Sequence, residues 1–230
     1  MPIKKGDFVE LEYTGRLKDS GEVFDTTDES IAKESGIYQQ GASYEPIIIC
    51  VGEHHILPGI DEFLIGKEPG EFELELPAEK AFGKKKPQLL QMIPMNMFRD
   101  QKIRPVPGLR LNIDGAVGIV KTVSGGRVVI DFNHPLSGKD VVYKLKVNRL
   151  VTDKKAQVEA ILRVLLGLRA PQVDVEGDKV KISLPGLPDQ LLSELKKKIE
   201  SLVKVEVEFS KPSADSKKTS DDKKAEDKSS

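Results

Sequence analysis

Apolar and polar residues alternate along the N-terminal part of the chain. Val9, Leu11 and Tyr13 are separated by single polar residues, and residues 72–76 alternate with glutamates in the same way. This period of two is typical of strands that bury one face. The unbroken apolar run Ile47–Val51 indicates a strand that is buried on both faces. These patterns together predict several strands, of which some are half-exposed and one is buried.

A short helix and two turns punctuate these strands. Residues 19–21 predict a turn, so that a hairpin leads into residues 22–25. The polar stretch 26–45 is predicted to be a long loop. Ile56–Ile65 predicts a short helix, because Pro58 suits its first turn and the glycine after it suits its end.

Prolines interrupt the next stretch at positions 87, 94, 105 and 107. Short runs with strand character follow at 109–114, 116–123 and 127–132, separated by Asp-Gly and Gly-Gly turns. Residues 141–151 then predict a long strand. This middle part of the chain is predicted to be a small β-rich unit.

The pattern changes after residue 152. Residues 158–166 have apolar positions at helical spacing, residues 173–175 and 180–184 flank a turn, and residues 192–202 are helical again before a last alternating strand at 203–209. The order predicts an α-β-β-α-β module. Residues 211–230 carry almost nothing to bury, so we expect them to be disordered.

Charge and composition narrow the class of protein. The chain has 230 residues, a net charge of −1, one cysteine, no apolar run of membrane-spanning length and no signal peptide pattern. We therefore expect a cytoplasmic protein without disulfides, membrane or nucleic-acid partner. The charge is uneven: residues 1–85 hold nine basic and eighteen acidic groups, and residues 86–130 hold seven and two. This contrast suggests separate modules.

Several motifs follow one another in a specific order. They are Val-Phe-Asp at 23–25, Val-Gly at 51–52, Ile-Leu-Pro-Gly-Ile-Asp at 56–61 and Ala-Phe-Gly at 81–83, followed by re-entry at 131–138. With this spacing the chain resembles the FKBP family of peptidyl-prolyl isomerases, and among them the SlyD-like, long archaeal type. The resemblance covers residues 1–152.

The resemblance implies an α+β fold, with an FKBP-like curved antiparallel sheet around a short helix, an inserted small β-rich domain and a C-terminal α+β domain. The implied domains are a split isomerase domain at 1–85 and 131–152, an insert-in-flap chaperone domain at 86–130, and a C-terminal domain at 153–210. It also implies catalysis of X-Pro isomerisation in an apolar cleft, without cofactor or metal. By match to the family, the catalytic positions are Tyr13, Phe24, Asp25 and Phe82, and the substrate-binding positions are Ile47, Ile49, Ile56, Leu57, Ile60 and Tyr143.

The family match leaves alternatives open at several residues. Met92, Met95, Met97 and Phe98 are predicted to bind clients, and the alternative is that they pack the core of the insert. Cys50 is predicted to be a core thiol, and the adjacent His54 and His55 a loop pair rather than metal ligands. His134 is predicted to be structural, with a smaller chance that it borders the cleft.

Partners follow from the same resemblance. Unfolded or Pro-containing polypeptides are the expected substrates, and binding of FK506-like macrolides is implied by the family. The C-terminal module suggests a homodimer, formed through a free sheet edge or apolar face. The competing function is a holding chaperone or assembly module with weak or no isomerase turnover, because Phe82 lacks a hydroxyl and Ile60 replaces a larger ring.

Overall fold

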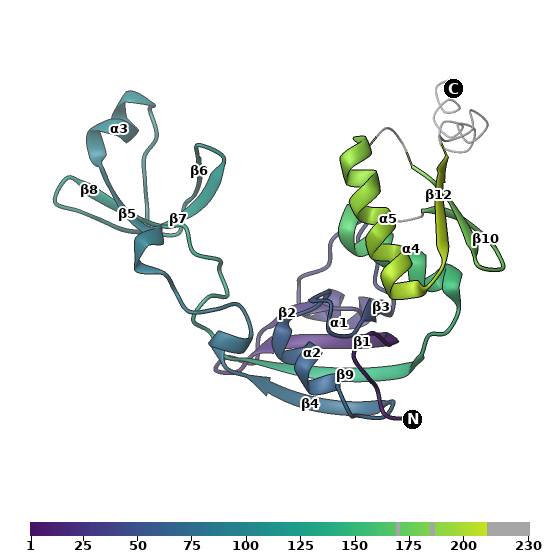
Figure 1. Ribbon diagram of the computed structural model, residues 1–230. Coiled ribbons are helices and arrows are strands. Elements are labelled where there is room, and N and C mark those ends of the chain that lie inside the picture. Colours follow the sequence, from purple (N-terminus) through teal and green to yellow (C-terminus); the bar gives the residue numbers. More distant parts are fainter. Residues whose placement is uncertain (169–170, 185–186, 211–230) are drawn as a thin grey trace, which may run out of the picture.

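Three sheets, each with its own strand order, organise the computed structural model (Figure 1). The structure describes residues 1–168, 171–184 and 187–210, so the predicted disordered tail at 211–230 lies outside the described residues. The α+β class, with a curved antiparallel sheet, a separate small sheet and a C-terminal α/β region, is confirmed.

The first sheet holds five antiparallel strands. They are β1 (Phe8–Leu17), β2 (Val23–Thr26), β3 (Ile47–Cys50), β4 (Gly70–Leu76) and β9 (Val141–Leu150). The order is β2-β1-β9-β4, with β3 also paired to β1. The helix α2 (Pro58–Leu64) has Pro58 in its first turn, and its Ile60 and Leu64 are fully buried in the core that this sheet forms. The strands of this sheet were therefore predicted correctly, although Ile47 and Ile48 of β3 are only half-buried.

One helix in this part was not predicted. Residues 29–34 form α1 (Glu29–Glu34), where the sequence suggested only a loop. The Asp28 side chain accepts hydrogen bonds from the backbone N–H groups of Ser30 and Ile31, and Ala32 is fully buried. A six-residue helix offers too short a window for periodicity, so its cap and the packing of Ala32 against the rest of the fold stabilise it.

The insert forms a four-stranded sheet. Its elements are β5 (Leu90–Pro94), α3 (Met95–Asp100), β6 (Arg110–Ile113), β7 (Ala116–Ser124) and β8 (Arg127–Asp131), with the strand order β5-β8-β7-β6. The last three strands were predicted, whereas β5 and α3 were not. Pro94 is the last residue of β5, which is an edge strand of this sheet. Proline has no backbone N–H to donate, and an edge strand tolerates this because one of its sides has no partner strand. Two short 3₁₀ turns, Ala78–Lys80 and Pro87–Leu89, lead into this unit.

The C-terminal module has the predicted α-β-β-α-β order. It consists of α4 (Lys154–Leu166), β10 (Gln172–Glu176), β11 (Lys179–Ser183), α5 (Asp189–Val203) and β12 (Glu206–Ser210). Its core is continuous with the first sheet, because Phe8, Cys50 and Val151 are buried in the same cluster. An ion pair of 3.1 Å between Lys198 of α5 and Glu53 joins the two parts. The module is therefore packed onto the sheet and is not merely tethered to it.

The outward face of the C-terminal sheet is polar over its described residues. Alternate residues turn outward, and these are Gln172, Asp174, Glu176, Lys179, Lys181, Glu206 and Glu208. The apolar residues of the same strands face the helices. This sheet therefore offers no apolar face for self-association, although β10 and β12 are edge strands, and the homodimer stays a prediction.

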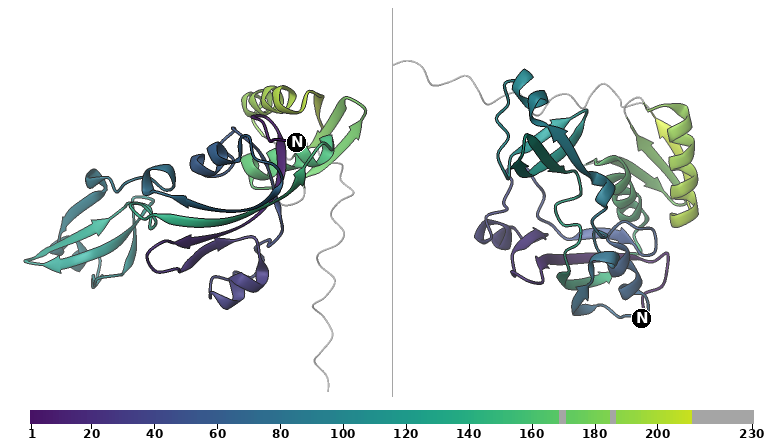
Figure 2. Two further views of the ribbon diagram at one scale, coloured as in Figure 1. Left: turned by 90° about the horizontal axis from the view of Figure 1, so that it is seen from below. Right: turned by 90° about the vertical axis from the view of Figure 1, so that its left-hand side faces the viewer.

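The insert and the C-terminal module lie at opposite ends of the first sheet (Figures 1 and 2). The insert begins after β4 and ends before β9, and the C-terminal module follows the other end of β9. Ten residues of strand separate these ends by roughly 33 Å. No helix in the described part of the chain is long and apolar enough to cross a membrane.

Candidate functional site

Four aromatic rings meet on one face of the first sheet, and we call Tyr13, Phe24, Phe82 and Tyr143 the aromatic cluster. The ring centroid of Phe24 lies 5.6 Å from that of Phe82 and 5.8 Å from that of Tyr143, and the rings of both pairs are nearly perpendicular. The ring centroid of Tyr13 lies 5.9 Å from that of Tyr143. Edge-to-face packing at such distances is favourable. The strands β1, β2 and β9 and the segment after β4 each supply one ring, so the cluster exists only in the folded chain.

Gly15 makes the cluster possible. It lies opposite Tyr143 in the pairing of β1 with β9. A Cβ atom at Gly15 would lie 2.6 Å from the ring of Phe24 and 3.0 Å from that of Tyr143. The rings therefore rest directly on the backbone of β1. Sequence reasoning missed this residue, although a glycine inside an alternating strand is a signal of close approach.

Asp25 lies at the border of the cluster. Its carboxylate accepts a hydrogen bond of 3.0 Å from the Tyr13 hydroxyl. Asp25 is exposed on its outer side, yet partial desolvation raises its pKa, and the hydrogen bond from Tyr13 opposes part of this rise. Burial and the nearby carboxylate of Asp25 both raise the pKa of Tyr13, so its hydroxyl stays protonated and acts as a donor.

The predicted apolar positions divide into two groups. Ile56, Leu57 and Ile47 are half-buried and pack against the same core as the aromatic cluster. Ile49 and Ile60 have no exposed surface. Both therefore support the cluster from beneath, and a substrate does not touch them in this conformation.

A histidine that sequence reasoning treated mainly as structural borders the cluster. The ring of His134 stacks on that of Phe82 with centroids 5.0 Å apart and planes 4° apart. Next to it, the Ser137 hydroxyl donates to the Phe82 carbonyl over 3.2 Å. The segment that returns from the insert thus holds Phe82 in position. In the sequence, His134 was marked only by its place in the re-entry segment.

The base of the insert is held by hydrogen bonds between its two connecting segments. The Asn133 side chain donates to the Lys86 carbonyl and accepts from the Lys86 N–H. Asp131 accepts from Lys85 over 3.1 Å and from the Asn133 N–H. These contacts couple the insert to the segment that carries Phe82.

The four predicted client residues of the insert are not equivalent. Met92 and Met97 are 58% and 54% exposed. Met95 and Phe98 pack into the core of the insert, and Phe98 is only 4% exposed. Both face inward because they lie three residues apart on α3 and share one side of that helix. Met95 and Phe98 therefore have the positions expected of core residues, whereas Met92 and Met97 are accessible to a client.

Cys50 and the neighbouring histidines are not part of the aromatic cluster. Cys50 is fully buried, and burial raises the pKa of its thiol to about 12. The backbone N–H of Cys50 donates to His55 Nδ1 over 3.1 Å. His55 therefore has a structural partner, and no group of three potential metal-ligating side chains occurs among the described residues.

Comparisons with known proteins agree with this geometry. The family model described as FKBP-type peptidyl-prolyl cis-trans isomerase matches residues 1–97, and the model described as FKBP26, IF domain, matches residues 91–136. The short-type peptidyl-prolyl cis-trans isomerase of Methanocaldococcus jannaschii is 38% identical over 146 residues, which cover 63% of this chain and 92% of that protein. The isomerase SlyD of Treponema pallidum is 32% identical over 155 residues, covering 64% and 77%.

The chain belongs to the FKBP family and is an FKBP-type peptidyl-prolyl cis-trans isomerase. Within that family it is SlyD-like and carries an insert-in-flap domain. Its substrates are therefore polypeptides that contain proline.

Proposed function

We propose that the aromatic cluster, with Asp25 at its border, is the catalytic site and that the insert holds unfolded chains beside it. The observation that carries the catalytic assignment is the 3.0 Å hydrogen bond from the Tyr13 hydroxyl to Asp25 at the edge of four packed rings. The half-buried Ile56 and Leu57 extend the same apolar surface.

The reaction needs no acid, base or metal. Rotation about a peptide bond meets a barrier of about 18–20 kcal/mol because planarity gives resonance. In the twisted transition state this resonance is lost, so the carbonyl is less polar than in the planar ground state. Apolar rings that displace water favour the less polar species. Asp25 and Tyr13 then orient the substrate by polar contacts at one side of the rings.

The test of the catalytic assignment is X-Pro exchange measured by NMR on a short peptide. Asp25→Ala should lower the exchange rate at least tenfold while the free energy of unfolding changes by less than about 1 kcal/mol. Asp19→Ala, in the neighbouring turn, is the matched control and should keep the wild-type rate. Equal rates for Asp25→Ala and Asp19→Ala would contradict the assignment.

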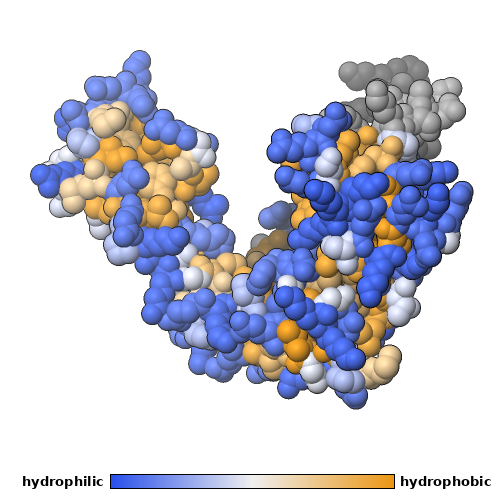
Figure 3. All heavy atoms as spheres, viewed as in Figure 1, coloured by the Kyte–Doolittle hydropathy of each residue, from blue (hydrophilic) through white to orange (hydrophobic). Residues whose placement is uncertain are grey.

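The distribution of exposed apolar residues supports the holding role of the insert. Among the described residues, five of the eleven large exposed hydrophobics lie in the insert: Leu90, Met92, Met97, Val106 and Val117. The insert shows apolar surface in the space-filling view (Figure 3). Methionine side chains adapt to partners of different shape. A holding site that is tethered beside a catalytic site raises the local concentration of substrate.

The test of the holding role is suppression of aggregation of an unfolded protein. Replacing Met92 and Met97 by serine should reduce suppression several-fold, because their exposed apolar surface is the proposed contact. The control is Leu191→Ser, which removes a side chain that is 50% exposed on α5. Exchange on a short peptide should be unchanged in both. Equal suppression by the methionine variant and the control would refute the role.

A further inference from the structure

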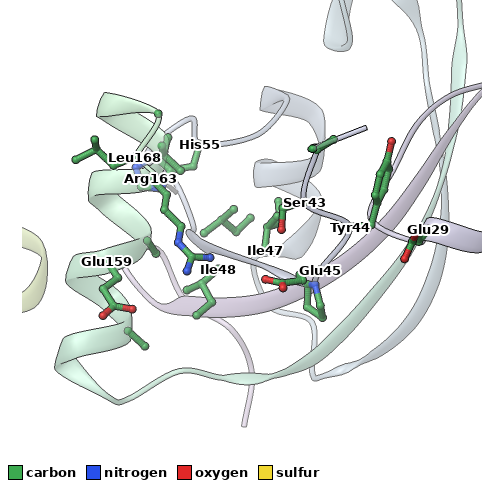
Figure 4. A pocket seen from close by; sticks show the side chains of 18 of the residues that line it. Glu29, Ser43, Tyr44, Glu45, Ile47, Ile48, His55, Glu159, Arg163 and Leu168 are labelled. Atoms are coloured by element: carbon green, nitrogen blue, oxygen red, sulfur yellow. The ribbon is translucent and has the colours of Figure 1, made fainter. Parts of the chain in front are cut away.

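A groove separates the C-terminal module from the loop that follows α1. It has a volume of about 860 Å³ and is lined by β3, by residues 41–46 and by α4. Figure 4 shows Glu159 and Arg163 of α4 on one side, Tyr44 and Glu29 on the other, and Ile47 and Ile48 between them. A volume of this size is typical of sites that bind ligands. None of the residues of the aromatic cluster lines it.

The walls of the groove combine apolar side chains with small ones. Val164 and Tyr38 are each 42% exposed, and Ile47 and Ile48 are half-buried. Ala156 and Ala160 line the side of α4, and their small side chains leave the space open. Apolar surface that remains exposed beside a hollow indicates a place where a partner packs.

The groove and the aromatic cluster share a border. Ile47 lines the groove and also packs against the core that carries Tyr13 and Phe24. His55 lines the groove, and Ile56 follows it directly in the chain. The groove therefore begins beside the core on which the cluster rests.

One edge of β3 faces away from its partner strand. The Val51 N–H donates to the Asp7 carbonyl, on the side of β1, whereas the Cys50 N–H points the other way, to His55. Main-chain groups alternate in direction along a strand, so those of Ile48 point to the same side as the Cys50 N–H. In the described sheet β3 pairs only with β1. The edge thus favours an occupant with an extended backbone.

The charge of the groove favours a basic occupant. Three carboxylates line it, from Glu29, Glu45 and Glu159, against the single guanidinium of Arg163. Glu29 pairs with Lys33. No ion pair among the described residues includes Glu45 or Glu159, so both are available to a partner. The split FKBP domain as a whole is acidic, which adds to the attraction.

We propose that this groove binds an extended apolar and basic segment of the same polypeptide whose X-Pro bond lies on the aromatic cluster. The proposal rests on the proposed function, because it takes the cluster as the place of the proline. The C-terminal module then selects among clients, since α4 supplies Glu159, Arg163 and Val164 to the wall.

The experiment compares short peptides on the full chain. The core peptide contains one X-Pro bond. Extended peptides add one leucine and two lysines on the N-terminal or the C-terminal side, and acidic peptides carry glutamate in place of lysine. Fluorescence anisotropy gives the Kd of each peptide. We expect one basic extension to lower Kd about tenfold, through partial burial of the leucine side chain together with attraction between the lysines and the carboxylates of the groove. The acidic extensions should give at most a twofold gain, because repulsion by the same carboxylates offsets the burial of the leucine.

Charge reversal localises the effect. Glu45→Lys with Glu159→Lys should reduce the tenfold gain to less than threefold, because exposed charge pairs are worth factors of up to about five each. Glu22→Lys with Glu194→Lys changes the net charge equally at exposed residues outside the groove, and should keep the gain. An equal gain in the two double variants would overturn the proposal, as would a lack of gain from every extension.

The exchange rate of the core peptide distinguishes a failure of the proposed groove from a failure of the proposed catalytic site. It depends on the aromatic cluster alone and should be the same in the wild type and both double variants. If the wild type did not accelerate exchange of the core peptide, the proposed catalytic site would be refuted. Normal exchange without a gain from any extension would refute only the groove.

Discussion

Gly15 tests whether the aromatic cluster is the catalytic site. In Gly15→Ala the new Cβ would lie 2.6 Å from Phe24, whereas carbon atoms pack at about 3.5–4.0 Å. The Phe24 ring must therefore move by about 1 Å. It is held between Phe82 and Tyr143, so the movement disturbs the whole cluster. Overpacking of this kind costs about 1–3 kcal/mol of stability.

The effect on activity should be larger than the effect on stability. A misplacement of about 1 Å in a catalytic site can cost about a hundredfold in rate. We expect the exchange of a short X-Pro peptide to fall by about ten- to a hundredfold in Gly15→Ala. The measurement is NMR exchange below the denaturation midpoint, which urea unfolding gives separately.

Gly118 provides a matched control within the same chain. A Cβ atom there would lie 2.5 Å from Ile130 and 2.8 Å from Phe132, which is an equal crowding in the insert. Gly118→Ala should destabilise the insert and weaken suppression of aggregation, yet leave exchange on a short peptide intact. Normal exchange in Gly15→Ala together with a loss of stability would refute the assignment of the cluster.

Three further predictions concern titrating groups. The pKa of Asp25 in the folded state is raised above 3.8, so the folded state binds more protons than the unfolded state just above that pH. The wild type should therefore lose stability there as pH rises. At pH 7, urea unfolding should show that Asp25→Asn is at least as stable as the wild type. Burial, with the charge of Lys198, lowers the pKa of His55 below 6.5, so stability should fall as pH falls below that value, and His55→Asn should lack this dependence. The buried Cys50 thiol should react with a thiol reagent at pH 8 only at the rate of local opening, and a fast reaction in the native state would contradict its burial.

Local patterns in the sequence were sufficient for most of the elements. The strands β1 and β4 follow from the alternation of apolar and polar residues, and α4 and α5 follow from helical spacing over thirteen and fifteen residues. Short elements were missed, because α1 and α3 are six residues long and β5 ends in a proline. At this length, capping and tertiary contacts decide the structure.

The candidate site depended on both kinds of information. The motif around Phe24 and Asp25 and its spacing to Phe82 identified the family, and these residues do lie together. The stacking of His134 on Phe82 and the approach of Phe24 to Gly15 involve residues far apart or on different strands. Periodicity describes one element at a time, so it carries no information on such contacts.

The sequence by itself determined the order of the modules, the faces that each long strand and helix buries, and the membership of a family of isomerases. Only the tertiary structure decided that Met95 and Phe98 turn inward while Met92 and Met97 stay exposed. It also decided that Phe8, Cys50 and Val151 join the core of the C-terminal module, which creates the groove beside β3. The reason is that burial between elements depends on which faces meet in space, and these contacts involve residues that are distant in the chain.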